Sequence, residues 1–125
     1  MKPNPQPAVR SQAGRPGPEF LYLTTLGRRT GLPREIEIWF TRRGDRYYLV
    51  AETGLRAQWV RNLRADPKVH WRVGGRTYSG RARVVVSARE AILAALVRTG
   101  SEAKYGWGDG LIVELRSAKP RQERG

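Results

Sequence analysis

Residues 24–34 contain the side chains of this sequence that are best suited to bind an anion. Arg28, Arg29 and Arg34 stand there among glycines and threonines. Glycine lets backbone N–H groups turn toward a bound anion, and a guanidinium group pairs with two oxygens at once, so the segment predicts a phosphate or carboxylate site. Each charge-assisted hydrogen bond contributes about 1.5 to 3 kcal/mol. The alternative interpretation is a hairpin loop whose arginines are only solvated.

The segments on either side of this loop have the patterns of β-strands. Residues 20–26 are largely apolar, and residues 34–42 alternate, with Ile36 and Ile38 on the face opposite Trp39. One face of the second segment therefore belongs to the core. Trp39 shares the other face with two glutamates, where an exposed indole needs a partner. That partner is a ligand, a second copy of the chain in a homodimer, or a sheet edge that the indole covers.

Two helices are predicted, at residues 57–65 and 88–98. The first follows a strand at residues 46–51 through a short loop, a junction that directs free backbone N–H groups at whatever occupies the loop. The second opens with a capping box from Ser87 to Glu90, and Gly100 can end it. An aromatic, glycine-punctuated loop at residues 103–109 follows. Its Tyr105 and Trp107 are either a lid over a planar ligand or the plug of a barrel.

The remaining strands are predicted at residues 68–73, 76–86 and 111–115. Six strands and two flanking helices make a mainly β (α+β) fold, a small and partly closed antiparallel barrel. We expect this domain to cover residues 19–116. Residues 1–18, which are rich in proline, are expected to be a disordered tail, and residues 117–125 a basic C-terminal tail.

Composition excludes several kinds of site. The 125-residue chain has no cysteine, and His70 lies on the polar face of a strand, so neither thiolate chemistry nor a metal site is predicted. No apolar run approaches the roughly 20 residues of a membrane span, and no secretory segment is evident, so we expect a cytoplasmic protein.

The formal net charge of +13 favours anionic partners of any kind. A nucleic-acid-binding barrel would interleave aromatic and basic side chains on one exposed strand face. Trp71 falls between His70 and Arg72, and strand alternation places it on the opposite face from both. The pattern therefore disfavours nucleic acid as the partner.

Two motifs in the sequence resemble the deazaflavin-dependent nitroreductase family, whose members are small split β-barrels that bind coenzyme F-420. The first is Thr-Thr-x-Gly-Arg-Arg-Thr-Gly-x-Pro-Arg at residues 24–34, and the second is Trp-x-x-Asn-Leu-x-Ala-x-Pro-x-Val at residues 59–69. The similarity runs from about residue 20 to residue 115. It implies a six-stranded antiparallel split β-barrel and an oxidoreductase of the nitroreductase or quinone reductase type. Reduced F-420 would deliver hydride to a quinone, nitroaromatic or activated alkene, so no catalytic side chain is required.

The resemblance also implies roles for particular residues. The arginine loop would hold the phosphate and acidic tail of the cofactor, and the turn after the strand at residues 46–51 would form the second wall of its site. Four aromatic side chains would border the ring and the acceptor. The cofactor-binding candidates are Arg28, Arg29, Thr30, Arg34, Thr53, Gly54 and Arg56, and the pocket candidates are Trp39, Trp59, Tyr105 and Trp107.

Several alternatives stay open at this point. The chain could be a reductase that binds flavin mononucleotide (FMN), or a barrel of the same fold that binds a cofactor, haem or fatty acid without turnover. A basic nucleic-acid-binding barrel is the second alternative. The absence of a nucleophile, metal site or triad fits the enzyme and the non-catalytic binder equally.

Overall fold

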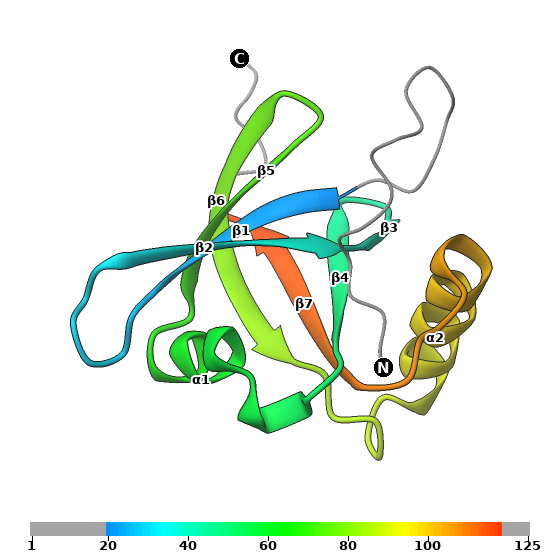
Figure 1. The fold of residues 1–125 in the computed structure, drawn as a ribbon. Helices are drawn as coiled ribbons and strands as arrows, with labels where there is room; N and C mark the ends of the chain where they lie inside the picture. The colour runs from blue at the N-terminus through cyan, green and yellow to red at the C-terminus, as the bar shows by residue number, and fades with distance from the viewer. Residues whose placement is uncertain (1–19, 119–125) are drawn as a thin grey trace.

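The computed structural model describes residues 20–118, which form a curled antiparallel sheet of seven strands with two α-helices (Figure 1). The predicted tail at residues 1–18 and residues 119–125 lie outside this part of the chain. The strands are β1 (Phe20–Leu26), β2 (Pro33–Trp39), β3 (Thr41–Arg43), β4 (Arg46–Ala51), β5 (Lys68–Val73), β6 (Arg76–Val84) and β7 (Leu111–Ser117). The helices are α1 (Gln58–Ala65) and α2 (Ala91–Tyr105), and a 3-10 turn, η2 (Gly54–Arg56), precedes α1.

The strand order β2-β1-β5-β6-β7-β4-β3 places β2 and β3 at opposite edges of the sheet. These two strands are consecutive in the chain, and only Phe40 separates them. Because a single residue cannot span a flat seven-stranded sheet, the sheet must curl until its edges meet at Phe40. The result is a half-barrel. The prediction of one strand over residues 34–42, and hence of six strands, is wrong because the chain changes edge at Phe40.

The concave side of the sheet holds the main core. Leu21 and Leu23 of β1, Leu49 of β4 and Trp71 of β5 point there and are at most 1% exposed. Helix α1 adds Val60 and Leu63 to the same core. Its apolar residues recur at helical spacing, so one face of the helix is buried while Arg61 and Arg64 on the other face stay exposed.

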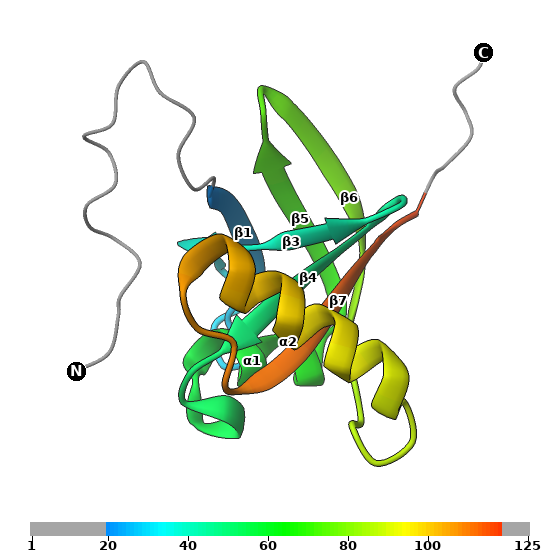
Figure 2. The ribbon, with the colours of Figure 1, turned by 90° about the vertical axis from the view of Figure 1, so that its right-hand side faces the viewer.

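Helix α2 lies across β4 and β7 on the outer side of the sheet (Figure 2). Ala94 and Val97 of the helix pack against Tyr48 of β4 and Ile112 of β7 in a second buried cluster. The strand pairs β6–β7 and β5–β6 continue the sheet beside this layer. Gly80 of β6 faces the carbonyl of Arg116 so closely that a side chain would overlap it, so β6 and β7 approach closely at this residue.

The predicted bounds of α2 were wrong at both ends. The helix begins at Ala91 and has no side-chain cap bond, so the Ser87–Glu90 capping box does not form. It also continues through Gly100 to Tyr105 and ends where Gly106 adopts φ 90°. A mid-helix glycine costs about 1 kcal/mol relative to alanine. Contacts of the last turn with Phe40 offset this cost, so tertiary structure overrides the local signal. No helix within residues 20–118 is long and apolar enough to cross a membrane.

Candidate functional site

The arginine loop joins β1 to β2 and is closed by its own hydrogen bonds. The N–H of Gly27 donates to the carbonyl of Leu32 at 2.8 Å, and the N–H of Gly31 donates to the carbonyl of Gly27 at 2.7 Å. Gly31 has φ 73°, which favours glycine, and a side chain at Gly27 would meet the Thr30 hydroxyl at 2.8 Å. The glycines are therefore required by the turn that presents the arginines.

Asn62 of α1 fixes the start of this loop. Its Oδ1 accepts hydrogen bonds from the Arg28 backbone N–H at 3.2 Å and from Arg28 Nη1 at 3.0 Å. Gln58 Oε1, one turn earlier, accepts from the same guanidinium at 2.9 Å. The Asn62 amide also donates to the Thr25 hydroxyl at 3.2 Å, and both residues are buried. Arg28 is therefore held by neutral amides that position it without cancelling its charge.

Asn62 belongs to the motif at residues 59–69, but neither Asn62 nor Gln58 was predicted to take part in the site. The available signal was a polar residue on the buried face of an amphipathic helix, because Asn62 follows Trp59 by three positions. The partner, Arg28, lies 34 residues earlier in the chain, so the pairing itself was not visible in the sequence.

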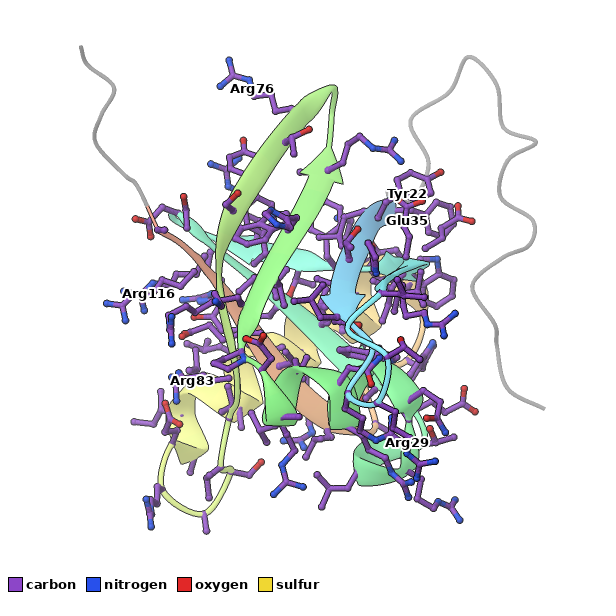
Figure 3. All side chains as sticks on the ribbon, turned by 90° about the vertical axis from the view of Figure 1, so that its left-hand side faces the viewer. Tyr22, Arg29, Glu35, Arg76, Arg83 and Arg116 are labelled. Carbon is purple, nitrogen blue, oxygen red and sulfur yellow. The ribbon has the colours of Figure 1, made fainter. Side chains whose placement is uncertain are left out.

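A cavity of about 410 Å³ opens between the arginine loop and α1. It brings together four of the predicted cofactor-binding residues with one of the predicted aromatic residues. Arg29, which projects near α1 in Figure 3, is exposed and has no hydrogen-bond or ion-pair partner within residues 20–118. The cavity is lined by Gly27, Arg28, Arg29, Thr30, Arg34, Ile36, Gln58, Trp59 and Asn62. Its lining within residues 20–118 contains three guanidinium groups and no carboxylate.

A second cavity, of about 290 Å³, continues from the first, because Ile36 and Trp59 line both. Its walls are largely apolar and aromatic, and its two charged residues are acids. The lining consists of Ile36, Glu37, Ile38, Trp39, Val50, Ala51, Glu52, Thr53, Trp59 and Trp107. We call the two cavities together the groove. One end of the groove is cationic, and the other is aromatic with a negative rim.

The aromatic end is built on Trp39. Its ring stacks on Tyr105, with centroids 4.4 Å apart and planes 8° apart, and lies 6.3 Å from the ring of Trp107. Trp39 thus covers the sheet edge within its own chain and also lines the groove. Its indole N–H and that of Trp107 are buried and have no hydrogen-bond partner within the described part of the chain.

Tyr105 and Trp107 differ in position, although both were expected in one loop. Tyr105 ends α2 and lines neither part of the groove, and its hydroxyl donates to the carbonyl of Phe40 at 2.8 Å. Trp107 lines the groove, and its carbonyl accepts from Ser101 Oγ at 2.7 Å. Arg98 Nη2 donates to the carbonyl of Gly110 at 3.0 Å, so residues 106–110 are tied to α2 at two points.

The turn after β4 contributes unequally to the groove. Thr53 lines the aromatic end. Gly54, with φ 60°, and Arg56 belong to the 3-10 turn and line neither cavity of the groove. The structure therefore brings Thr53 to the groove and leaves Gly54 and Arg56 beside it.

The strongest ion-pair network lies outside the groove, on the outer face of the sheet. Glu114 of β7 is 2% exposed and accepts hydrogen bonds from Arg83 Nε and the Tyr48 hydroxyl, both at 2.8 Å. Arg83, labelled in Figure 3, also binds both oxygens of Glu90 at 2.8 Å. Burial alone would raise the pKa of Glu114, but the hydrogen bonds from Arg83 and Tyr48 outweigh it and lower this pKa. Burial and the Glu114 carboxylate raise the pKa of Tyr48 to about 12.

No group of three or more potential metal ligands occurs within residues 20–118. His70 is exposed, and its Nδ1 lies 2.9 Å from the Ser79 hydroxyl.

Sequence comparisons relate the chain to a known family. The profile of the family described as F420H(2)-dependent quinone reductase matches residues 6–108. A protein of Mycobacterium tuberculosis named as an F420H(2)-dependent quinone reductase is 36% identical over 71 residues, which are 54% of this chain and 48% of that protein. The chain thus spans about half the length of the curated relatives that it matches.

Solved structures share the fold at low sequence identity. The haem storage protein HutZ of Vibrio cholerae has a TM-score of 0.66 at 18% identity, covering 81% of this chain and 82% of that one. A structure named F420 Reductase has a TM-score of 0.59 at 19% identity, covering 82% of this chain and 89% of that one. The profile match over residues 6–108, which include the whole groove, decides the family. The chain belongs to the F420H(2)-dependent quinone reductase family.

Proposed function

We propose that this protein is an oxidoreductase that uses reduced coenzyme F-420 to reduce a small organic acceptor, with a quinone as the first choice. The observation that carries the proposal is the division of the groove. Three guanidinium groups, those of Arg28, Arg29 and Arg34, gather at one end, and aromatic side chains gather at the other. This arrangement matches a ligand with an anionic tail and a planar ring.

The donor set of the groove fits coenzyme F-420. Arginine forks suit the phosphate and carboxylate groups of its tail, and the side-chain amides of Asn62 and Gln58 hold Arg28 without adding negative charge. The Arg29 guanidinium has no partner among the described residues, so all of its N–H groups are available to a ligand. Ile36 and Trp59 line both parts of the groove, which supports the proposal that they border the ring.

The chemistry that reduced F-420 supplies when bound is hydride delivery from its own ring. The protein's contribution is therefore to bind the tail, orient the ring and exclude water. Trp59, Trp39 and Trp107 present apolar surface along the aromatic end, so water is displaced there when a flat acceptor enters. No acid, base or nucleophile of this chain is assigned to the step.

The acceptor would lie at the aromatic end. The buried indole N–H groups of Trp39 and Trp107 have no acceptor within residues 20–118, and quinones carry carbonyl oxygens that accept hydrogen bonds. Glu37 and Glu52 at the same end disfavour anionic acceptors. Both features support an uncharged quinone ahead of an acceptor that carries a carboxylate or sulfonate.

The homodimer and the cytoplasmic location stay predictions. A homodimer was suggested by the exposed indole expected at Trp39, but this ring packs on Tyr105 of its own chain. The cytoplasm as the location is likewise part of the proposal. The non-catalytic cofactor carrier remains the second candidate, because a carrier needs the same groove.

Steady-state oxidation of reduced F-420 in the presence of menadione tests the proposal and separates it from a carrier. We expect turnover, and for Arg29→Ala a rise of roughly tenfold in the KM for F-420, since one charge-assisted hydrogen bond is worth about 1.5 kcal/mol or more. The matched control is Arg116→Ala, because Arg116 projects from a different side of the protein (Figure 3). Tight F-420 binding without oxidation by any quinone, nitroaromatic or activated alkene would assign the protein to the carriers.

A further inference from the structure

A third cavity lies apart from the groove and shares no lining residue with it. Its volume is about 600 Å³, within the range of roughly 300 to 1,000 Å³ that small-molecule sites occupy. It lies where β3, the last turns of α2 and the β5–β6 hairpin meet. The lining residues are Phe40, Thr41, Arg42, Tyr47, Val73, Gly74, Arg76, Tyr78, Gly100 and Lys104.

The apolar part of this cavity contains three aromatic rings that contact one another in sequence. Phe40 lies 5.6 Å from Tyr47, and Tyr47 lies 5.7 Å from Tyr78, measured between ring centroids. Tyr78 in turn stacks on the buried ring of Trp71 at 5.6 Å with planes 15° apart. Phe40 and Tyr47 are buried and hold Tyr78 in place, so the partly exposed ring of Tyr78 offers a preformed surface to a flat ligand.

The charged residues that line the cavity in the described part of the chain are all cations. Lys104 Nζ lies 4.1 Å from the centroid of Phe40 and donates to the Phe40 carbonyl at 3.0 Å, while Arg42 Cζ lies 5.2 Å from the centroid of Tyr47. Arg76 extends from the β5–β6 hairpin (Figure 3) and has no hydrogen-bond or ion-pair partner within residues 20–118. Among residues 20–118, no acidic side chain lines the cavity. Its charge is therefore opposite to that of the aromatic end of the groove.

An independent observation points to a bound polar group. The hydroxyl of Thr41, a lining residue, is buried and has no hydrogen-bond partner in the described part of the chain. A buried hydroxyl without a partner loses its bonds to water and gains nothing in return. A ligand oxygen in the cavity would restore one of these bonds.

We propose that this cavity is a second ligand site, separate from the cofactor groove, and that it takes a small aromatic acid. The ring of the ligand lies on the partly exposed ring of Tyr78, and its carboxylate, sulfonate or phosphate lies among Arg42, Lys104 and Arg76. Thr41 supplies the remaining hydrogen bond. The aromatic surface selects a planar ligand, and the three cations select a negative charge.

The test is a titration of the full ¹⁵N-labelled chain with 2-naphthoate, followed by the backbone amide signals of its glycines. Gly74 and Gly100 line the proposed site, whereas Gly27 lines the cofactor groove. We expect saturable shifts at Gly74 and Gly100 and little change at Gly27. The uncharged analogue 2-naphthalenemethanol should bind about tenfold more weakly, since it lacks the charge-assisted bonds.

Variants separate the site from the overall basic charge. Arg42→Gln should raise the Kd for 2-naphthoate about tenfold, and Thr41→Val should raise it by a smaller factor. Arg29→Gln, which removes one charge from the cofactor groove, should leave this Kd unchanged, and saturating F-420 should not displace 2-naphthoate. The proposal is wrong if 2-naphthoate gives no saturable shift, if it binds no better than the alcohol, or if Arg29→Gln or F-420 removes it.

Discussion

The hydroxyl of Tyr105 binds both backbone groups of Phe40: it accepts from the N–H at 3.1 Å and donates to the carbonyl at 2.8 Å. Phe40 is the residue at which the chain passes from β2 to β3, between the two edges of the sheet. Phe40 belongs to neither strand. Its backbone N–H and carbonyl are instead hydrogen-bonded by Tyr105, the last residue of α2. The same Tyr105 ring stacks on Trp39. One side chain therefore joins the curl of the sheet to the aromatic end of the groove.

Removing this hydroxyl should destabilise the fold while the stacked ring remains. We expect Tyr105→Phe to lower the free energy of unfolding by roughly 1 to 3 kcal/mol, because the buried N–H and carbonyl of Phe40 lose a partner. Urea unfolding measures this change. Tyr78→Phe is the control, because the Tyr78 hydroxyl has no hydrogen-bond partner within residues 20–118. Equal stabilities of the two variants would show that the bridge to Phe40 contributes nothing.

Substituting Asn62 by aspartate would add a negative charge to the anion site with little change in side-chain shape. In Asn62→Asp the carboxylate can still accept from the Arg28 N–H and guanidinium, and the Thr25 hydroxyl can turn to donate. We expect near-normal thermal stability, with the Kd for F-420 raised about tenfold or more because Arg28 is neutralised. Isothermal titration calorimetry beside a melting curve measures both quantities. A stable Asn62→Asp protein that binds F-420 normally would remove Arg28 from the cofactor site.

The negative rim of the aromatic end predicts selection by acceptor charge. The kcat/KM for 1,2-naphthoquinone should exceed that for its 4-sulfonate by about tenfold or more, given repulsion of one to a few kcal/mol at short range. Glu37→Gln and Glu52→Gln should each narrow this ratio. Glu35→Gln is the matched control, because Glu35 is on the same strand as Glu37 but pairs with Arg72 at 3.1 Å and does not line the groove. An unchanged ratio in both test variants would contradict an acceptor at this end.

The Glu114 network predicts how stability depends on pH at both extremes. The pKa of Glu114 is lower in the folded protein than its ordinary value of 4.5, so its stabilisation is present above about pH 4.5 and is lost as the pH falls below it. The pKa of Tyr48 is raised from 10.0 to about 12, so its stabilisation is lost as the pH rises through that interval. Chemical unfolding at a series of pH values should show a flatter acid limb for Glu114→Gln than for the wild type. Parallel acid limbs would exclude Glu114 as a source of the acid sensitivity.

The sequence predicted the elements whose signals are local. Strand β1 has the predicted bounds, 20–26, because apolar residues and the following arginine loop mark both ends. The grouping of Arg28, Arg29 and Arg34 around one cavity also follows from a short hairpin, since residues in one turn lie close together. In both cases the residues within one short segment were enough to predict the structure.

The features that the sequence did not predict depend on distant contacts. The change of edge at Phe40 involves one residue and leaves the strand alternation intact, so residues 34–42 read as a single strand. Gly100 signals a helix end, but contacts of Lys104 and Tyr105 with Phe40 extend α2 beyond it. Asn62 acts on the site by binding Arg28, and Tyr105 binds the backbone of Phe40. Both pairs are far apart in the sequence, so they follow only from the fold.

Equilibrium titration shows whether the groove binds coenzyme F-420 through its arginine end. Purified protein would be titrated with F-420, FMN and haem at low salt and at about 0.3 M salt, where screening weakens diffuse charge attraction far more than a shaped site. We predict saturable F-420 binding at both salt concentrations, tighter than FMN or haem, weakened roughly ten- to a hundredfold by Arg29→Ala and unchanged by Arg116→Ala. Preferred binding of FMN or haem, or equal losses from Arg29→Ala and Arg116→Ala, would contradict this mode of binding.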